Sequence, residues 1–371
     1  MKACNRQLFA LGLVVLVGVL LPGCASVPLD AARHDYYAGR FDDADAALTN
    51  LPDTNDRILF LMERGMIRQA RHDFIGSTRD WREAVQLEEA FETHSVTKAG
   101  ASMVVNDSML NYRGYPFERV LVHSFLARNY LAQGLWDDAA IEARNIRRRL
   151  ADLDGFPDDA YSRYIAGFCL EQCGDVEGAA LEYKTAATLA PNAPIDARTG
   201  AFLVSAGSHT NQPTTPQATE LVCFVDIDGR DGAMPDRAEF YANGRLLGIS
   251  HTLTDTAQLA YASERRMAGR RVAKEIARIG VKGAIAAVVG NQNKDLGQLV
   301  WFLLMSTETP DTRHWATLPA CLAVARVPCP PDLQRVEVVF RAPSGATGRR
   351  LTLAPFARRG RTLFAFCRDY P

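Results

Sequence analysis

Beyond its first 24 residues the chain has no apolar run long enough to cross a membrane as a helix, which needs about 20 residues. It also contains no Gly-x-Ser-x-Gly and no His-Glu-x-x-His motif. The seven histidines are scattered without metal-ligand spacing, and the formal net charge is only −1. These absences argue against the common serine hydrolases, zinc peptidases and nucleic-acid-binding proteins. We therefore predict no catalysis, no cofactor and no metal ion.

The first 24 residues are typical of an export signal. A basic start leads into an apolar run from Leu8 to Leu21, which ends at Pro22, Gly23 and Cys24. An apolar core of about 13 residues is too short for a spanning helix but suits a secretory signal. A small residue before Cys at the cleavage point resembles the lipobox of bacterial lipoproteins, which implies loss of residues 1–23 and lipidation, for example with palmitate, at Cys24. The alternative is an ordinary signal peptide with a chance cysteine.

The residues after Cys24 suggest where the mature protein lies. Ala25 is not the Asp that favours inner-membrane retention in enterobacterial lipoproteins, so the resemblance implies an outer-membrane anchor facing the periplasm. Only Ala25 to Leu29 separate the anchor from the first helical pattern, a reach of roughly 20 Å. We therefore expect the folded body to lie against the membrane surface.

A six-residue pattern recurs through residues 24–206. It consists of Gly, any residue, an aromatic or aliphatic residue, two further residues and a small residue, and it starts at Gly39, Gly134 and Gly174, with a degenerate copy at His72. Gly permits a tight turn between helices, and the small residue permits close packing. The last copy has tetratricopeptide spacing, so we predict a TPR-like α-solenoid whose groove binds peptides or protein surfaces. A plain helical bundle is the alternative.

An insertion between residues 91 and 118 interrupts this pattern. Pro116 and Glu118 suit the first turn of a helix. The segment before them is predicted either to form the N-terminal turn of that helix, packed by Tyr112 and Phe117, or to lie across the groove. In the second interpretation the candidate protein-binding residues are Asn106, Asp107, Tyr112, Arg113 and Tyr115.

Charge is distributed unevenly between the two halves of the chain. Residues 24–200 contain 19 Lys and Arg against 28 Asp and Glu, a net of −9, whereas residues 201–371 contain 21 against 15, a net of +6. Such halves either dock on each other or serve different partners. A predicted helix at 263–289 carries basic residues at intervals of four: Arg266, Arg270, Lys274, Arg278 and Lys282. This stripe is either solvated, a contact for anionic lipid head groups, or a contact for the acidic half.

The sequence after residue 206 predicts a second domain. Residues 207–219 are typical of a linker, and residues 220–371 contain short runs that alternate apolar and polar side chains. Strands are predicted at 221–226, near 238–249, and at 321–327, 335–341, 350–356 and 363–368, with a helical insertion at about 255–305. The predicted fold class is therefore α+β, mainly α, with the solenoid followed by a small antiparallel β-sandwich with inserted helices. The six cysteines after Cys24 allow fifteen pairings, and none is favoured.

Two short runs resemble the markers of an uncharacterised Gram-negative lipoprotein family. One runs from Glu308 to Pro319 and the other from Tyr112 to Arg119. Members of this family join helical repeats to a C-terminal β domain, which is what the resemblance implies here, without any activity. The residues themselves indicate a structural motif in the first run, in which Asp311 pairs with Arg313 and Trp315 fills the core.

Together these features predict a non-catalytic outer-membrane lipoprotein that binds other envelope proteins as a scaffold or an assembly or accessory factor. Its expected partners are envelope proteins and, through the lipid anchor, the membrane, but not nucleic acid. Two alternatives stay open: a periplasmic enzyme acting on the cell wall, and glycan or peptidoglycan binding by the β domain.

Overall fold

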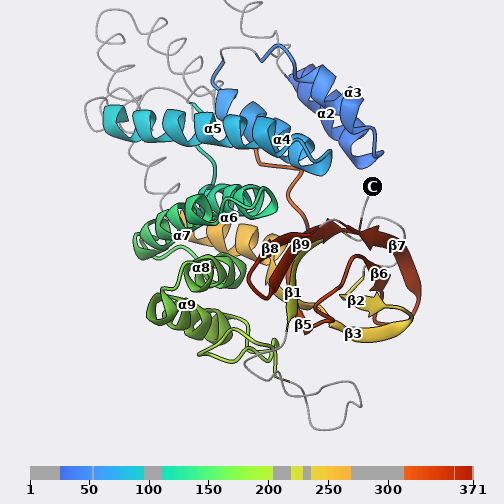
Figure 1. The fold of residues 1–371 in the computed structure, drawn as a ribbon. Helices are drawn as coiled ribbons and strands as arrows, with labels where there is room; N and C mark the ends of the chain where they lie inside the picture. Colours follow the sequence, from blue (N-terminus) through green and yellow to red (C-terminus); the bar gives the residue numbers. More distant parts are fainter. Residues whose placement is uncertain are drawn as a thin grey trace, which may run out of the picture.

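A computed structural model describes residues 26–51, 54–95, 111–203, 219–228, 235–268, 313–354 and 356–369. Within these residues the fold is mixed α/β, with helices in the first half and two sheets, mostly antiparallel, in the second (Figure 1). The predicted signal peptide, residues 1–23, and the predicted lipidation site Cys24 lie outside the described residues. No helix in the described part of the chain is both long and apolar enough to cross a bilayer.

The helices of the first half form four consecutive hairpins. The pairs are α2 (Ser26–Tyr37) with α3 (Phe41–Ala47), α4 (Arg57–Ala70) with α5 (Phe74–Ser95), α6 (Pro116–Ala132) with α7 (Trp136–Ala151), and α8 (Ala160–Gln172) with α9 (Val176–Leu189). In each hairpin the residue two positions before the second helix has a positive φ angle: Gly39, His72, Gly134 and Gly174. The turns therefore lie at the four places that the repeated pattern predicts.

Two sheets follow the helices. The first has the strand order β4-β5-β1-β9-β8, with β1 (Glu220–Ile227), β4 (His251–Asp255), β5 (Cys321–Pro328), β8 (Ala357–Arg359) and β9 (Thr362–Arg368). The second has the order β3-β2-β6-β7, with β2 (Arg237–Ala242), β3 (Arg245–Ile249), β6 (Val336–Arg341) and β7 (Thr347–Leu353). Strands β1 and β9 are parallel, so the purely antiparallel prediction is wrong. No hairpin joins these two strands, and nothing local forces them to run in opposite directions.

The predicted strand near 238–249 is in fact a hairpin of β2 and β3. Ala242 pairs with Arg245 across a two-residue turn, in which Asn243 and Gly244 have φ angles of 50° and 76°. Asn-Gly is a strong signal for this kind of turn, because both residues tolerate positive φ. The predicted helical insertion is described only at 256–268, and its remainder lies outside the described residues.

The first sheet lies between the helices and the second sheet, so the described elements form three layers (Figure 1). Along β1, Leu221, Cys223 and Val225 pack against the second sheet, whereas Val222 and Phe224 pack among the helices. One apolar cluster therefore contains residues from both sides of the predicted linker. All six described cysteines are free thiols.

Two arginines tie the helices to the first sheet. Arg128 on α6 donates two hydrogen bonds to Asp226 on β1, at 2.7 and 2.9 Å, and both side chains are fully buried. Arg326 on β5 lies 2.7 Å from Glu171 of α8 and 2.8 Å from Glu220 of β1. Of these pairs, only Arg326–Glu171 joins a base of the second half to an acid of the first half, because in the Arg128–Asp226 pair the base belongs to the first half.

His251 predicts a pH dependence of stability. Its ring is mostly buried and stacks on Phe202, with centroids 4.6 Å apart. Burial lowers the pKa of His251 from 6.5 to about 4. Unfolding therefore takes up a proton at this site below pH 6.5, and the free energy of unfolding should fall as the pH decreases from 6.5 towards 4. Urea denaturation of wild type and His251→Phe at pH 7 and pH 4.5 tests this. The variant should lose less stability than wild type on acidification, and an equal loss would contradict the assignment.

Candidate functional site: a polar cleft and an occupied inner groove

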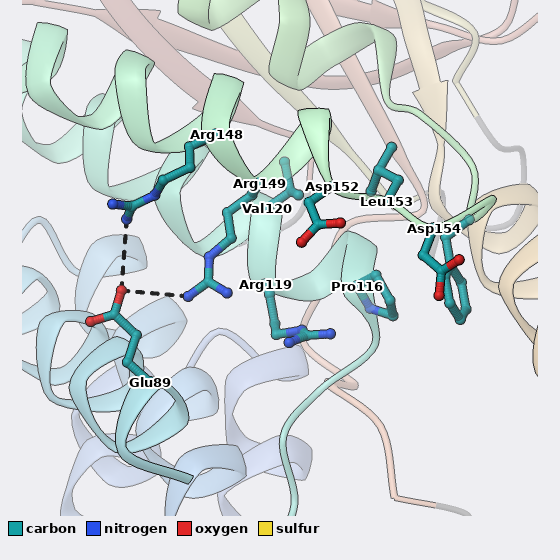
Figure 2. Close-up of a pocket in the computed structure, with 10 residues that line it drawn as sticks. Glu89, Pro116, Arg119, Val120, Arg148, Arg149, Asp152, Leu153 and Asp154 are labelled. Atoms are coloured by element: carbon teal, nitrogen blue, oxygen red, sulfur yellow. Dashed lines mark ion pairs between the residues drawn. The ribbon is translucent and has the colours of Figure 1, made fainter. Parts of the chain in front are cut away.

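A cleft of about 580 Å³ opens where α5 ends, α6 begins and α7 ends (Figure 2). Figure 2 shows Arg148 and Arg149 of α7 directed towards Glu89 of α5, at 3.7 and 3.6 Å, with Asp152 and Asp154 further along the cleft. The remaining lining residues are Pro116, Arg119, Val120, Leu153 and Phe156. The cleft thus has a basic part beside Glu89 and an acidic part after the end of α7.

Glu88 holds two arginines of the basic part of the cleft in place. This carboxylate is 3% exposed and accepts hydrogen bonds from Arg119, at 2.6 Å, and from Arg149, at 2.5 Å. Charge-assisted pairs of this geometry are strong and orient the guanidinium planes. The Arg148 side chain is 65% exposed, so it is the arginine of this group that extends furthest into solvent.

The predicted protein-binding segment is followed directly by Pro116, which lines the cleft. Arg113 donates a hydrogen bond to the carbonyl of Phe91 at 3.1 Å, and the Tyr115 hydroxyl donates to Glu264. Tyr112, in contrast, is 4% exposed and donates to the buried carboxylate of Glu118 at 2.6 Å. Tyr112 therefore packs the N-terminal turn of α6, as the first interpretation of this segment predicts. The candidate residues Asn106 and Asp107 lie outside the described residues.

The start of the basic stripe contacts Asp154, which lines the cleft. Arg266 donates to the carbonyl of Asp154, at 2.9 Å through Nη2, so the described start of the stripe contacts the helical half. The other stripe residues, Arg270, Lys274, Arg278 and Lys282, lie outside the described residues. Segment 112–115 and the start of the stripe are two separate candidates in the sequence. In the structure they therefore meet beside one cleft.

A second site is a groove between α2, α4 and α6, called here the inner groove, which holds residues 313–317, the inner segment. Buried carboxylates of two helices accept its backbone N–H groups. Glu63 accepts from Ala316 at 2.9 Å and from Thr317 at 3.2 Å, and Glu118 accepts from Trp315 at 2.9 Å. Burial raises the pKa of Glu118, and the hydrogen bonds that it accepts oppose this rise.

The carbonyl groups of the inner segment are bound from α2. Arg33 donates to the carbonyl of His314 at 2.8 Å, and the Tyr37 hydroxyl donates to the carbonyl of Ala316. Side chains from three helices thus bind five main-chain groups within four consecutive residues. Arg33, Tyr37 and Glu63 are not among the residues that the sequence indicates, because helical periodicity does not distinguish a buried polar residue from a solvated one.

The inner segment brings the two marker runs together, since Glu118 belongs to one and Trp315 to the other. The Trp315 ring packs edge-on against Trp81 and Phe125, with centroids 6.2 and 5.7 Å apart, so its predicted core role is confirmed. Arg313 pairs with Asp56 at 2.7 Å, and Asp311, its predicted partner, lies outside the described residues.

No protein-family model matches the chain, and no curated protein matches it either. Among the described residues no group of three or more His, Cys, Asp and Glu side chains has the arrangement of a metal site.

Proposed function

We propose that the protein is a non-catalytic lipoprotein, anchored in the outer membrane through Cys24 and facing the periplasm, that binds another envelope protein as a scaffold or accessory factor. The four hairpins with positive-φ turn residues support a tetratricopeptide-like α-solenoid. The two sheets that share an apolar cluster support a small β-sandwich. The two marker runs support membership of the lipoprotein family that they resemble.

The observation that carries the proposal is the convergence at the cleft. Tyr115 and Arg266 come from two distant parts of the chain. Tyr115 precedes the lining residue Pro116 and donates to Glu264, and Arg266 donates to the carbonyl of the lining residue Asp154. Because residues 313–317 fill the inner groove, the cleft is the better partner site in this arrangement. Its basic and acidic parts fit a protein segment that carries charges of both signs, and such complementarity favours specificity.

The anchor predicts a clear change in fractionation. Cys24→Ser removes the only thiol at the predicted cleavage point, so labelled palmitate should no longer be incorporated and the protein should stay as precursor or become soluble. Metabolic labelling and membrane fractionation of cells expressing each form measure this. Incorporation of the label into the variant would show that the lipid is attached elsewhere.

The cleft predicts a charge-dependent interaction. Arg148→Glu should reduce recovery of the partner from solubilised membranes about tenfold, since a lost and reversed charge pair costs on the order of 1.4 kcal/mol or more. Arg350→Glu is the matched control, because Arg350 is 61% exposed on β7, in the second sheet. Quantitative mass spectrometry after affinity capture measures both. Equal losses with the two variants would argue against the cleft.

A further inference from the structure

The inner groove keeps its shape through contacts that do not involve the segment it holds. Glu63 is paired with Arg33, at 2.6 Å. Glu118 accepts hydrogen bonds from the Tyr112 hydroxyl, at 2.6 Å, and from the Tyr115 N–H, at 2.7 Å. Each carboxylate therefore has partners on the helical side as well as on the inner segment. Such a site is pre-organised, and binding a segment there costs little rearrangement.

The aromatic part of the groove is also built from the helices alone. Trp81 donates its indole N–H to the carbonyl of Met62, at 3.1 Å, and stacks on Phe125 with centroids 5.7 Å apart. Trp315 enters the space beside these two rings. A slot lined by fixed aromatic rings prefers an aromatic side chain, because edge-on ring contacts add to the apolar area buried.

The inner segment itself belongs to no helix or strand. Its residues have irregular backbone structure, and β5 starts four residues after Thr317, at Cys321. Apart from the Trp315 ring and the Arg313–Asp56 pair, the contacts described above are made by its main chain. Removing the segment would break no ladder of a sheet and no turn of a helix.

From these three observations we infer that the inner groove is a receptor for a segment that carries an arginine two residues before a tryptophan, and that residues 313–317 are an internal ligand which keeps it closed. This inference rests on the proposed function, since the external ligand is taken to be such a segment of an envelope protein. The carboxylates bind its N–H groups, Arg33 and Tyr37 bind its carbonyls, Asp56 binds the arginine and the aromatic slot binds the tryptophan.

The test uses the mature chain and a fluorescein-labelled peptide with the sequence of residues 313–319. In the Trp315→Ala protein the internal ligand is weakened, so the peptide should bind at least about tenfold more tightly than it binds wild type. A peptide with Ala in place of Trp is the control and should bind at least about tenfold more weakly. Fluorescence anisotropy measures the affinities, and far-UV circular dichroism checks that the variant is folded. Failure of a folded variant to bind, or equal binding of both peptides, would overturn the inference.

Hydrogen exchange in the wild type keeps the inference testable if Trp315→Ala does not fold. The amides of Trp315, Ala316 and Thr317 should exchange by local opening, at least about a hundredfold faster than the amides of β1. Exchange of these amides only through global unfolding, at the rate of β1, would identify the segment as a fixed part of the core. Both experiments use this chain alone or with one peptide. A negative result therefore does not test the proposal that a partner binds at the cleft.

Discussion

Replacing Arg128 by methionine should lower the free energy of unfolding by about 3–5 kcal/mol, because it leaves the carboxylate of Asp226 buried without its charged partner. Arg128 and Asp226 are both fully buried, and the guanidinium also lies over the rings of Phe125 and Phe366, at 4.9 and 4.7 Å. Arg368 is 3.9 Å from Asp226, too far to replace the two short hydrogen bonds. Urea denaturation followed by circular dichroism measures the loss.

Two further variants distinguish the loss of stability caused by an unpaired buried charge from a loss caused by general damage to the core. Arg128→Met combined with Asp226→Leu should recover most of the lost stability, since the carboxylate that Arg128 neutralises is removed as well. Arg350→Ala removes an exposed pair with Glu337 and should cost no more than about 0.5 kcal/mol. A single Arg128→Met variant that loses less than about 1 kcal/mol would show that the pair does not hold the two halves together.

Ala179→Trp should destabilise the protein by about 3 kcal/mol, because α8 and α9 pack too closely to accept a larger side chain. Ala179 is 1% exposed, and its carbonyl lies only 3.2 Å from the place where a Cβ on Gly167 would stand. Leu181→Trp is the matched control on the same helix, since Leu181 is 54% exposed and its replacement should change the stability little. Thermal denaturation compares the two variants, and similar melting temperatures would contradict the close packing of this hairpin.

Local features of the fold can be predicted from the sequence. A turn between two helices depends on a few neighbouring residues, so the pattern at Gly39, Gly134 and Gly174 was sufficient to place the hairpins, and even His72 takes the same positive φ. The hairpin at Asn243 and Gly244 had an equally local signal, which the interpretation as one long strand overlooked.

Features that depend on contacts between residues far apart in the sequence cannot be predicted in this way. Arg128 and Asp226 are separated by 98 positions, and each is an ordinary charged residue in its own segment. The parallel pairing of β1 and β9 likewise has no local cause. Each marker run suggested a structural role by itself, but nothing in the sequence indicated that Glu118 would bind the backbone of Trp315.

The occupied inner groove changes the functional prediction more than any other observation. The sequence predicted that a partner binds in the groove of the repeats, whereas Glu63 and Glu118 bind the chain's own backbone there. Of the candidate residues, Tyr115 adjoins Pro116 and Arg266 contacts Asp154, and both of these neighbours line the cleft. We therefore propose that the partner is bound first at the cleft.

Photo-crosslinking in cells tests whether the partner binds at the cleft. Benzoylphenylalanine in place of Arg148 puts the reactive group in the cleft, and the same residue in place of Leu181 or Arg350 puts it on other exposed surfaces. After irradiation, we expect a cross-linked species with a second envelope protein from position 148 and none from the two controls. Cross-linking at a control position but not at position 148 would contradict this expectation.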